Sequence, residues 1–222
     1  MYSWRYYFIM RYIIVFCMFS FSSNSLKAKP FPLPELTGKD IQKMWGITNL
    51  KKASELATIN SARGWSFSPY LSTKLRPFWD GVQEEVAKIL PKDLIYQIIL
   101  VVASRNRCFY WMCEVVEGLR QKKFDEATLM ALQIDLEKIK YPEKEKILLK
   151  LAEAMTVQSK DANELSLRAI DLGWKEGQIA KTIYLVGLYN MLTRVANAFA
   201  YEPDSMHPYD ASKFPMTSCK KN

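Results

Sequence analysis

Hydrophobic residues recur every three or four positions along most of the chain after residue 37, which is the spacing of one face of an α-helix. This periodicity predicts helices over 125–139, 142–157, 161–173 and 175–200. Another helix is expected from Thr37 to about Asn60, with an interruption near Gly46, because Thr37 and Asp40 have the spacing of a capping box. The pattern indicates a chain of helices joined by short connections.

The middle of the chain is less regular. Gly64–Pro69 predicts a loop, and Tyr70–Leu75 and Pro77–Leu90 predict two short helices, since proline favours the first position of a helix. Over 91–105 apolar residues nearly surround the helical axis, as in a buried helix. A buried strand is the alternative, but the helical pattern continues directly into 106–120 without turn residues. About eight helices are expected, so the predicted fold class is all-α.

The first 28 residues have a different pattern. Arg5 and Arg11 precede an apolar run from Tyr12 to Phe21, and a small, polar stretch follows. This order is typical of a secretory signal peptide, and the run is shorter than the roughly 20 residues that a membrane span needs. We therefore expect export to the periplasm or the medium, with cleavage after Ser25 or Ala28 or a true start at Met10. An uncleaved leader that anchors the protein in a membrane is the alternative.

These patterns divide the chain into four parts. They are a signal peptide over 1–28, an N-terminal extended segment and helix over 29–70, a helical domain over 71–203 and a flexible tail over 204–222. The prolines at 203, 208 and 215 predict that the chain is loose from Tyr201 onward. No stable membrane span is expected after the leader is removed.

Composition and charge narrow the functional classes. Hydrophobic residues make up 49% of the 222, which is enough to bury a core. The net charge is +8, but the basic residues are scattered without interleaved aromatics, so nucleic acid is not an expected partner. His207 is the single histidine, and no glycine-rich phosphate loop is present. Neither a metal site nor a cofactor is therefore expected.

Four cysteines are present, and Cys17 belongs to the leader. Of the other three, Cys108, Cys113 and Cys219, one must stay unpaired within a monomer. Cys108 and Cys113 would lie about 140° apart around a shared helix, so a bond between them would require the helix to break.

The order of segments from Pro91 onward resembles the alkylhydroperoxidase D-like and carboxymuconolactone decarboxylase family. The resemblance is carried by IYQIILVVASRNRCFYW at 95–111, by YPEKEKILLKLAEAMT at 141–156, and by LGWKEGQI at 172–179 before a helix that ends in NMLTRVANAF. It covers about residues 71–203. It implies an all-helical domain that acts on a small organic molecule, a peroxide or a lactone-type acid, and that forms homo-oligomers.

The family's redox motif is missing here. It consists of a Glu on the buried helix, a Cys-x-x-Cys pair and a His, which together reduce a peroxide. With Cys108 as the first cysteine, those positions hold Tyr96, Trp111 and Val115. In the decarboxylase register Trp111 matches, but Tyr110 and Glu114 replace the Glu and the His. Both registers lack the histidine, so ordinary two-cysteine peroxidase chemistry is not expected.

Two residues are candidates for catalysis. Cys108 would lie near a helix start beside Arg105 and Arg107, which favours the thiolate, although buried cysteines are commonly inert. Glu114 could act as a general acid or base if it is buried at a pocket, although helix glutamates are commonly solvated.

Five further residues are candidates for a substrate pocket, although core packing or solvation would also explain each: Tyr96, Tyr110, Trp111, Glu117 and Arg194. Arg194 lies within an apolar helix, and a buried arginine there would need a carboxylate or carbonyl partner, which Glu114 or Glu117 could supply. The functional hypotheses are an enzyme whose active site differs from that of the family, a catalytically silent binding or scaffold protein that retains the fold and, as a third class, an obligate component of an assembly.

Overall fold

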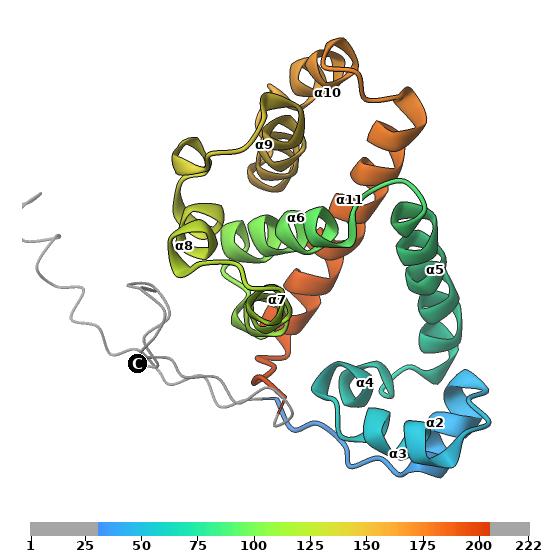
Figure 1. Cartoon of the computed structure of the whole chain (residues 1–222). Helices are drawn as coiled ribbons and strands as arrows, with labels where there is room; N and C mark the ends of the chain where they lie inside the picture. Colours follow the sequence, from blue (N-terminus) through green and yellow to red (C-terminus); the bar gives the residue numbers. More distant parts are fainter. Residues whose placement is uncertain (1–30, 205–222) are drawn as a thin grey trace, which may run out of the picture. The chain divides into compact units, whose positions relative to one another are not determined.

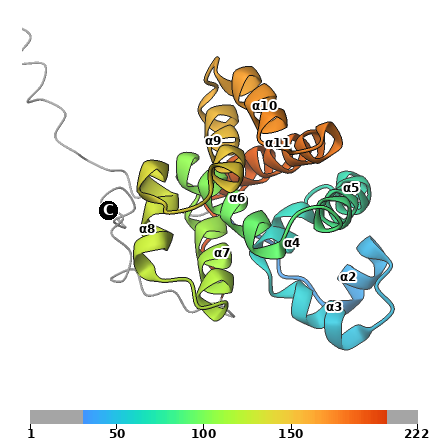
Figure 2. The ribbon, with the colours of Figure 1, turned by 45° about the horizontal axis from the view of Figure 1, so that its top comes forward.

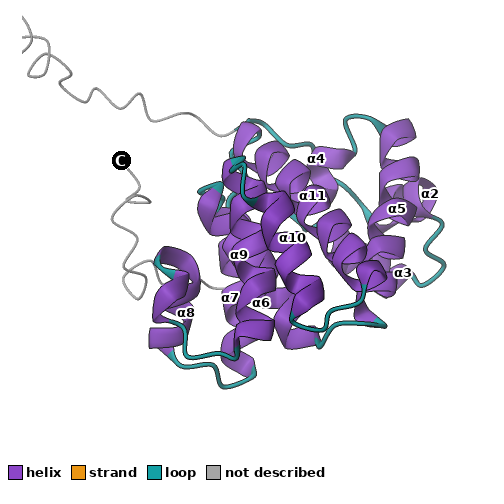
Figure 3. Cartoon of the chain, turned by 90° about the horizontal axis from the view of Figure 1, so that it is seen from above, coloured by secondary structure: helices purple, strands orange, loops and turns teal. Residues whose placement is uncertain are grey.

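The computed structural model describes residues 31–204, and all of them fall within one compact unit. Every regular element in this range is helical (Figure 3), so the all-α prediction is confirmed. The elements in chain order are α2 (Gly38–Trp45), α3 (Leu50–Ala57), α4 (Asn60–Trp65), α5 (Pro69–Ala87), α6 (Lys92–Arg105), α7 (Phe109–Gln121), α8 (Glu126–Ile134), the 3₁₀ helix η1 (Leu136–Lys138), α9 (Glu143–Val157), α10 (Ala162–Asp171) and α11 (Glu176–Ala198).

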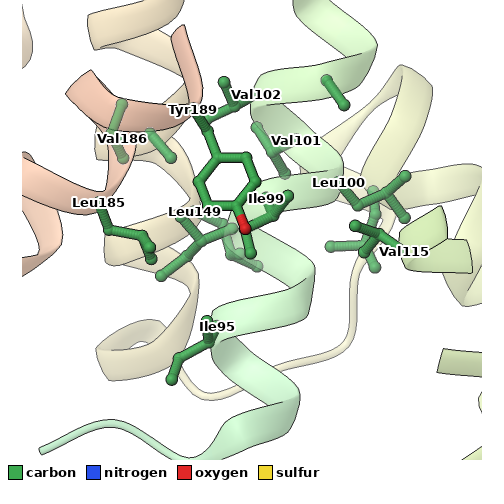
Figure 4. Close-up of a cluster of buried hydrophobic side chains, with 14 of the residues drawn as sticks. Ile95, Ile99, Leu100, Val101, Val102, Val115, Leu149, Leu185, Val186 and Tyr189 are labelled. Atoms are coloured by element: carbon green, nitrogen blue, oxygen red, sulfur yellow. The ribbon is translucent and has the colours of Figure 1, made fainter. Parts of the chain in front are cut away.

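Helix α6 lies at the centre of the main core. It contacts α7, α8, α9 and α11, which surround it in Figure 1. Its residues from Ile98 to Ala103 are buried consecutively, because neighbouring helices cover every side of it. In Figure 4, Ile99 and Val102 of α6 lie beside Tyr189 of α11. The buried-helix interpretation of this segment is therefore correct, and the strand alternative is excluded.

A second, smaller cluster joins the first three described helices. Ile41 and Met44 of α2 pack with Ala53 and Ala57 of α3 and with Ala62 of α4. Helix α2 begins with the predicted capping box, in which the Thr37 side chain accepts from the Asp40 amide and the Asp40 carboxylate accepts from the Thr37 amide. These three helices lie at one end of α5 (Figures 1 and 2). The candidate site lies between this cluster and the main core.

The break that was predicted between two short helices near residue 76 is absent. The two short helices expected on either side of Arg76 form a single helix, α5, with Pro77 inside it. A proline removes one backbone hydrogen bond, but packing on both sides can keep the helix continuous. Before Pro77 the hydroxyl of Ser72 accepts a hydrogen bond from Trp45, and after it Trp79 packs on the main core.

Two other predicted bounds need correction. Residues 125–139 do not form one helix, because Asp135 is extended and its carboxylate accepts from the Glu137 amide, which starts η1. Between α6 and α7 a turn is made by Arg107, whose φ of 52° is left-handed. The pattern of apolar residues cannot reveal that a single residue has a non-helical backbone, because the residues on both sides of it keep helical spacing.

The segment predicted to be loose from Tyr201 is buried at its start. Tyr201 and Asp204 are 7% and 6% exposed. The Asp204 carboxylate accepts a hydrogen bond of 2.8 Å from the backbone amide of Asn60, the first residue of α4. Helix α4 extends into the predicted loop, and its own N-cap, Ile59, offers no side-chain acceptor. A residue from the far end of the described chain supplies that acceptor instead.

No helix in the described range is long and apolar enough to cross a membrane. The predicted signal peptide over 1–28, His207 and Cys219 lie outside the described residues.

Candidate functional site

A cavity of about 140 Å³ lies between the N-terminal cluster and the main core. Helices α2 to α5 and α7 contribute to its wall together with the segment after α11. The side chains that line it are Trp45, Leu56, Ile59, Ser61, Ala62, Trp65, Arg76, Trp79, Tyr110, Trp111, Glu114 and Asp204. Five of these are aromatic and three are charged. A mainly apolar hollow with a few polar groups is the usual form of a small-molecule site.

The aromatic side chains form a continuous series. Trp45 contacts Trp65, Trp65 contacts Trp79, and Trp79 contacts Trp111, with ring centroids 5.4 to 6.1 Å apart and interplanar angles of 70° to 90°. Tyr110 then contacts Trp111 at 5.4 Å and 81°. Near-perpendicular pairs at these distances are favourable, because the positive edge of one ring meets the negative face of the next. The wall is therefore held by its own ring contacts.

Arg76 of α5 is the cationic residue of the lining. Its guanidinium lies over the rings of Trp45 and Trp79, at 5.0 and 5.2 Å from their centroids. Its Nε donates to both carboxylate oxygens of Asp80, at 2.9 and 2.8 Å, one helical turn later. The charge of Arg76 is therefore compensated by Asp80 and stacked against aromatic faces.

Asp204 joins the cavity wall to two helices. One carboxylate oxygen accepts the 2.8 Å hydrogen bond from the Tyr110 hydroxyl of α7, and the other accepts from the amide at the start of α4. The Tyr110 hydroxyl also lies 3.3 Å from the hydroxyl of Ser61. Burial and the neighbouring Asp204 charge raise the pKa of Tyr110 far above its ordinary range. Tyr110 is therefore a neutral donor at physiological pH.

Glu114 lines this cavity and has a pKa close to neutral pH. Burial, and next the negative charge of Asp204, raise the pKa of Glu114 from 4.5 to about 7. Both effects disfavour the carboxylate, the first through lost hydration and the second through like-charge repulsion. Near neutral pH Glu114 populates both protonation states, which is the property that a general acid or base needs.

Three of the predicted site residues meet at this cavity: Tyr110, Trp111 and Glu114 all line it. They lie on one side of α7 because residues three and four apart share a helix face. No prediction placed the four tryptophans in one wall, although Trp is a rare residue and the chain has six. Asp204 was missed because the prolines around it indicate a loose tail, and Arg76 because no local pattern marks it.

Cys108 lies at the N-cap of α7, as expected, but it is 0% exposed and does not line the cavity. Glu114 comes six positions after Cys108, which corresponds to about 120° around the helix. The neighbouring Arg105, which was expected to favour a thiolate, instead forms an ion pair with Glu153 at 2.6 Å and donates to the Gln133 carbonyl. The structure does not bring the two predicted catalytic residues together.

The remaining predicted pocket residues lie elsewhere. Tyr96 packs toward Gly118, under the cation of Lys92, and Glu117 accepts from Gln121. The expectation of a buried Arg194 paired with Glu114 or Glu117 is wrong. Arg194 is exposed and donates to the Asn190 carbonyl and side chain, because its position on α11 faces solvent.

Within residues 31–204 no three histidine, cysteine, aspartate or glutamate side chains cluster as metal ligands would. Of the two carboxylates of the cavity, Asp204 has contacts that explain its position, since it caps α4 and binds Tyr110.

Several solved structures share this fold. An uncharacterized peroxidase-related protein from Silicibacter sp. is 20% identical, with a TM-score of 0.58 and alignment over 83% of this chain and 92% of that one. An alkylhydroperoxidase AhpD core protein from Ralstonia eutropha is 16% identical, with a TM-score of 0.58 over 80% and 93% of the two chains.

A debrominase is 14% identical, with a TM-score of 0.53 over 75% of this chain and 83% of its own. A cysteine-to-alanine variant of it was solved in complex with 2,3,4-tribromopyrrole. No family model and no curated protein sequence matches the chain. The resemblance read from the sequence is thus confirmed at the level of structure: the described chain has the alkylhydroperoxidase D-like fold.

Proposed function

We propose that this protein acts on a small organic molecule in the cavity around Glu114, and that Glu114 transfers a proton to or from that molecule. The observation that carries the proposal is the position of Glu114: a carboxyl group with a pKa of about 7 lines a cavity walled by aromatic rings. A group that titrates near the working pH is an efficient general acid or base.

The residues that line the cavity are better suited to proton transfer than to peroxide reduction. Peroxide reduction by thiols requires an accessible thiolate and a second thiol to resolve the sulfenic acid. None of the described residues that line the cavity is a cysteine or a histidine. Glu114 occupies the helix face that the decarboxylase register assigned to the motif, and a carboxyl group can replace a histidine in moving a proton.

The structural neighbours support the small-molecule part of the proposal. One of them, the debrominase, was captured with a bromopyrrole, so this fold can hold a compact cyclic ligand. Two others are described as peroxidase-related. We do not propose peroxidase chemistry for this chain, because the identity is 20% or less and the residues of this cavity do not include a thiol.

The test is turnover of a panel of small carbonyl compounds, lactone-type acids, organic hydroperoxides and compounds that carry an amine or ammonium group by the mature chain. We expect turnover of a substrate that requires proton transfer, and a loss of about 100-fold or more in Glu114→Gln, which is isosteric but does not ionise. Cys108→Ser and Glu117→Gln are matched controls on the same helix. Both should retain activity, since neither residue lines the cavity.

Peroxide turnover that is lost in Cys108→Ser and kept in Glu114→Gln would overturn the proposal. Unchanged turnover in Glu114→Gln on every active substrate would also reject it.

The second candidate is a binding protein that keeps the fold without catalysis. The aromatic wall favours it, because five aromatic side chains can hold a ligand without any chemistry. Binding of a ligand to the cavity with no turnover across the panel would select this function.

Export is a separate part of the proposal. It rests on the order of Arg11, the apolar run and the small residues up to Ala28. The N-terminal residue of the purified, exported protein would test it. A mature terminus after Ser25 or Ala28 supports cleavage, and an intact leader in the membrane fraction supports the anchored alternative.

Self-association is also proposed. An apolar groove of about 490 Å³ between α5 and α11 is lined by Phe78 and Tyr184, which are 52% and 64% exposed. Exposed aromatic surface of this kind is typical of interfaces. Light scattering should give a mass above that of one chain, and Phe78→Asp should lower it.

A further inference from the structure

We propose that the ligand of the Glu114 cavity is a small organic cation, such as an amine or a quaternary ammonium group. This inference rests on the proposed function, because it names the substrate class of the same site. It replaces the peroxide or lactone-type acid that the family resemblance implies. Three independent features of the lining carry it: the aromatic wall, the balance of charge and the size.

The aromatic wall already binds a cation. The guanidinium of Arg76 lies 5.0 Å from the Trp45 ring centroid and 5.2 Å from that of Trp79. The faces of aromatic rings attract cations, and Trp is the most effective of them. Three more aromatic residues of the wall, Trp65, Tyr110 and Trp111, are not among those that Arg76 covers. They offer the same kind of surface to a ligand.

Above a pH of about 7, where Glu114 is mostly ionised, the charge of the lining is negative. Glu114 and Asp204 are acidic, and Arg76 is the single base among the residues of the wall. Arg76 is compensated by Asp80, which binds its Nε with both oxygens. A cationic ligand would therefore meet a surplus of negative charge, whereas an anion would meet two carboxyl groups. Partly desolvated charges interact more strongly than they would in bulk water.

The volume suits a small head group. A buried space of about 150 Å³ holds a ligand of about six heavy atoms, such as benzene. The observed 140 Å³ is therefore enough for a trimethylammonium group and its first methylene. A larger ligand would extend toward Trp45 and Glu114, which are only partly buried.

Binding of a cation in this cavity would be coupled to the protonation state of Glu114. The charged and titratable groups that face Glu114 here are Arg76 of α5, Tyr110 of α7 and Asp204 after α11. A bound positive charge would favour the ionised form of Glu114, so binding should release a proton near neutral pH. Binding should accordingly strengthen as the pH rises from about 6 to about 8.

Choline and its neutral isostere 3,3-dimethyl-1-butanol form a matched pair of probes, since they differ in the charged nitrogen. The full chain would be titrated with each and followed by calorimetry and by tryptophan fluorescence at about pH 8. We expect choline to bind about tenfold more tightly than the alcohol, and to bind about tenfold more weakly at about pH 6. Calorimetry in buffers of different ionisation enthalpy should detect the released proton.

Glu114→Gln should reduce choline affinity to near that of the alcohol and remove the pH dependence. Its control is Glu117→Gln, which changes the net charge equally on the same helix outside the cavity and should leave both affinities unchanged. 3,3-Dimethylbutanoate is the anionic probe. Circular dichroism of each variant confirms that it is folded.

Equal or tighter binding of the alcohol would overturn the cation inference and leave the proton-transfer function intact, since the site would then be a neutral apolar one. Tighter binding of 3,3-dimethylbutanoate would overturn it in favour of an acid recognised by Arg76. Failure of choline to bind the folded chain at about pH 8 would overturn it as well. The proposed function fails separately, when turnover persists in Glu114→Gln.

Discussion

The hydroxyl of Tyr110 donates a hydrogen bond of 2.8 Å to the carboxylate of Asp204, which lies 94 positions later in the sequence. The other oxygen of the same carboxylate accepts from the backbone amide at the start of α4. Asp204 therefore connects the end of the described chain to α4 and α7, two of the helices that border the cavity. Its contacts also place a negative charge near Glu114, which contributes to the raised pKa there.

Removing the Asp204 carboxylate should destabilise the protein. Asp204→Ala leaves the buried Tyr110 hydroxyl and the first amide of α4 without this acceptor, which should lower the free energy of unfolding by about 2–3 kcal/mol. Asp204→Asn should cost less, because an amide oxygen can still cap α4. Urea denaturation of the three chains measures both values.

The matched control is Glu202→Ala, two residues earlier. Glu202 is exposed and contacts Asn60 through its backbone carbonyl, which the substitution keeps. Its unfolding free energy should change by less than about 0.5 kcal/mol. Similar losses for Glu202→Ala and Asp204→Ala would contradict the capping role of Asp204.

Gly64 should not tolerate a side chain. A Cβ at this position would lie 1.6 Å from the Tyr201 hydroxyl oxygen and 2.5 Å from the ring carbon that carries it. Gly64→Ala should therefore displace the buried Tyr201 ring and lower the free energy of unfolding by about 2–4 kcal/mol. Thermal unfolding of the variant provides the measurement.

Gly81→Ala is the control for Gly64→Ala, since a Cβ at residue 81 of α5 meets nothing within 4 Å. It should be neutral or stabilising by up to about 1 kcal/mol, because alanine favours helix more than glycine does. Tyr201→Ala should relieve most of the effect of Gly64→Ala. Additive losses in that double variant would rule out the steric explanation.

The raised pKa of Glu114 has a consequence for stability. The folded protein binds the Glu114 proton up to a pH of about 7, whereas the unfolded chain releases it near 4.5. The stabilisation from Glu114 protonation is thus complete below pH 4.5 and is lost as the pH rises to about 7. Allowing for partial exposure, the loss should be about 2 kcal/mol.

Other groups titrate over the same range, so the comparison with Glu114→Gln isolates this component. The difference in unfolding free energy between variant and native chain should grow in favour of the variant from about pH 4.5 to about pH 7. Parallel curves over that range would show that Glu114 ionises normally in the folded state.

Cys108 should be inert in the folded protein. It is 0% exposed and packs within the main core, so a thiol reagent can reach it only after local unfolding. Alkylation should be slow in buffer and fast in urea, with the labelled residue located by peptide mass spectrometry. Rapid labelling of Cys108 in buffer would restore it as a candidate nucleophile.

The sequence predicted the main core well and the cavity only in part. Helix α6 could be identified because its apolar residues surround the axis, and α2 because the capping box of Thr37 and Asp40 is local. Tyr110, Trp111 and Glu114 were found because a family motif lies on α7. Each of these signals is contained within one helix.

The missed features depend on residues far apart in the chain. The N-terminus of α4 is capped by Asp204, and the tryptophan wall combines α2, α4, α5 and α7. Arg194 appeared buried because its neighbours are apolar, yet its side of α11 is exposed while Thr193 and Ala196 on the other side are buried. Helical periodicity gives the buried face of a helix, but tertiary packing decides which single residues leave it.

The most direct test of the account is the ionisation of Glu114 itself. A carbon-13 NMR titration of the side-chain carboxyl groups, with the Glu114 signal assigned by its absence in Glu114→Gln, gives the midpoint in the native chain. We expect a midpoint of about 7. A midpoint near the ordinary value of 4.5 would contradict it, because Glu114 would then be a fully ionised carboxylate at neutral pH without the means to transfer a proton.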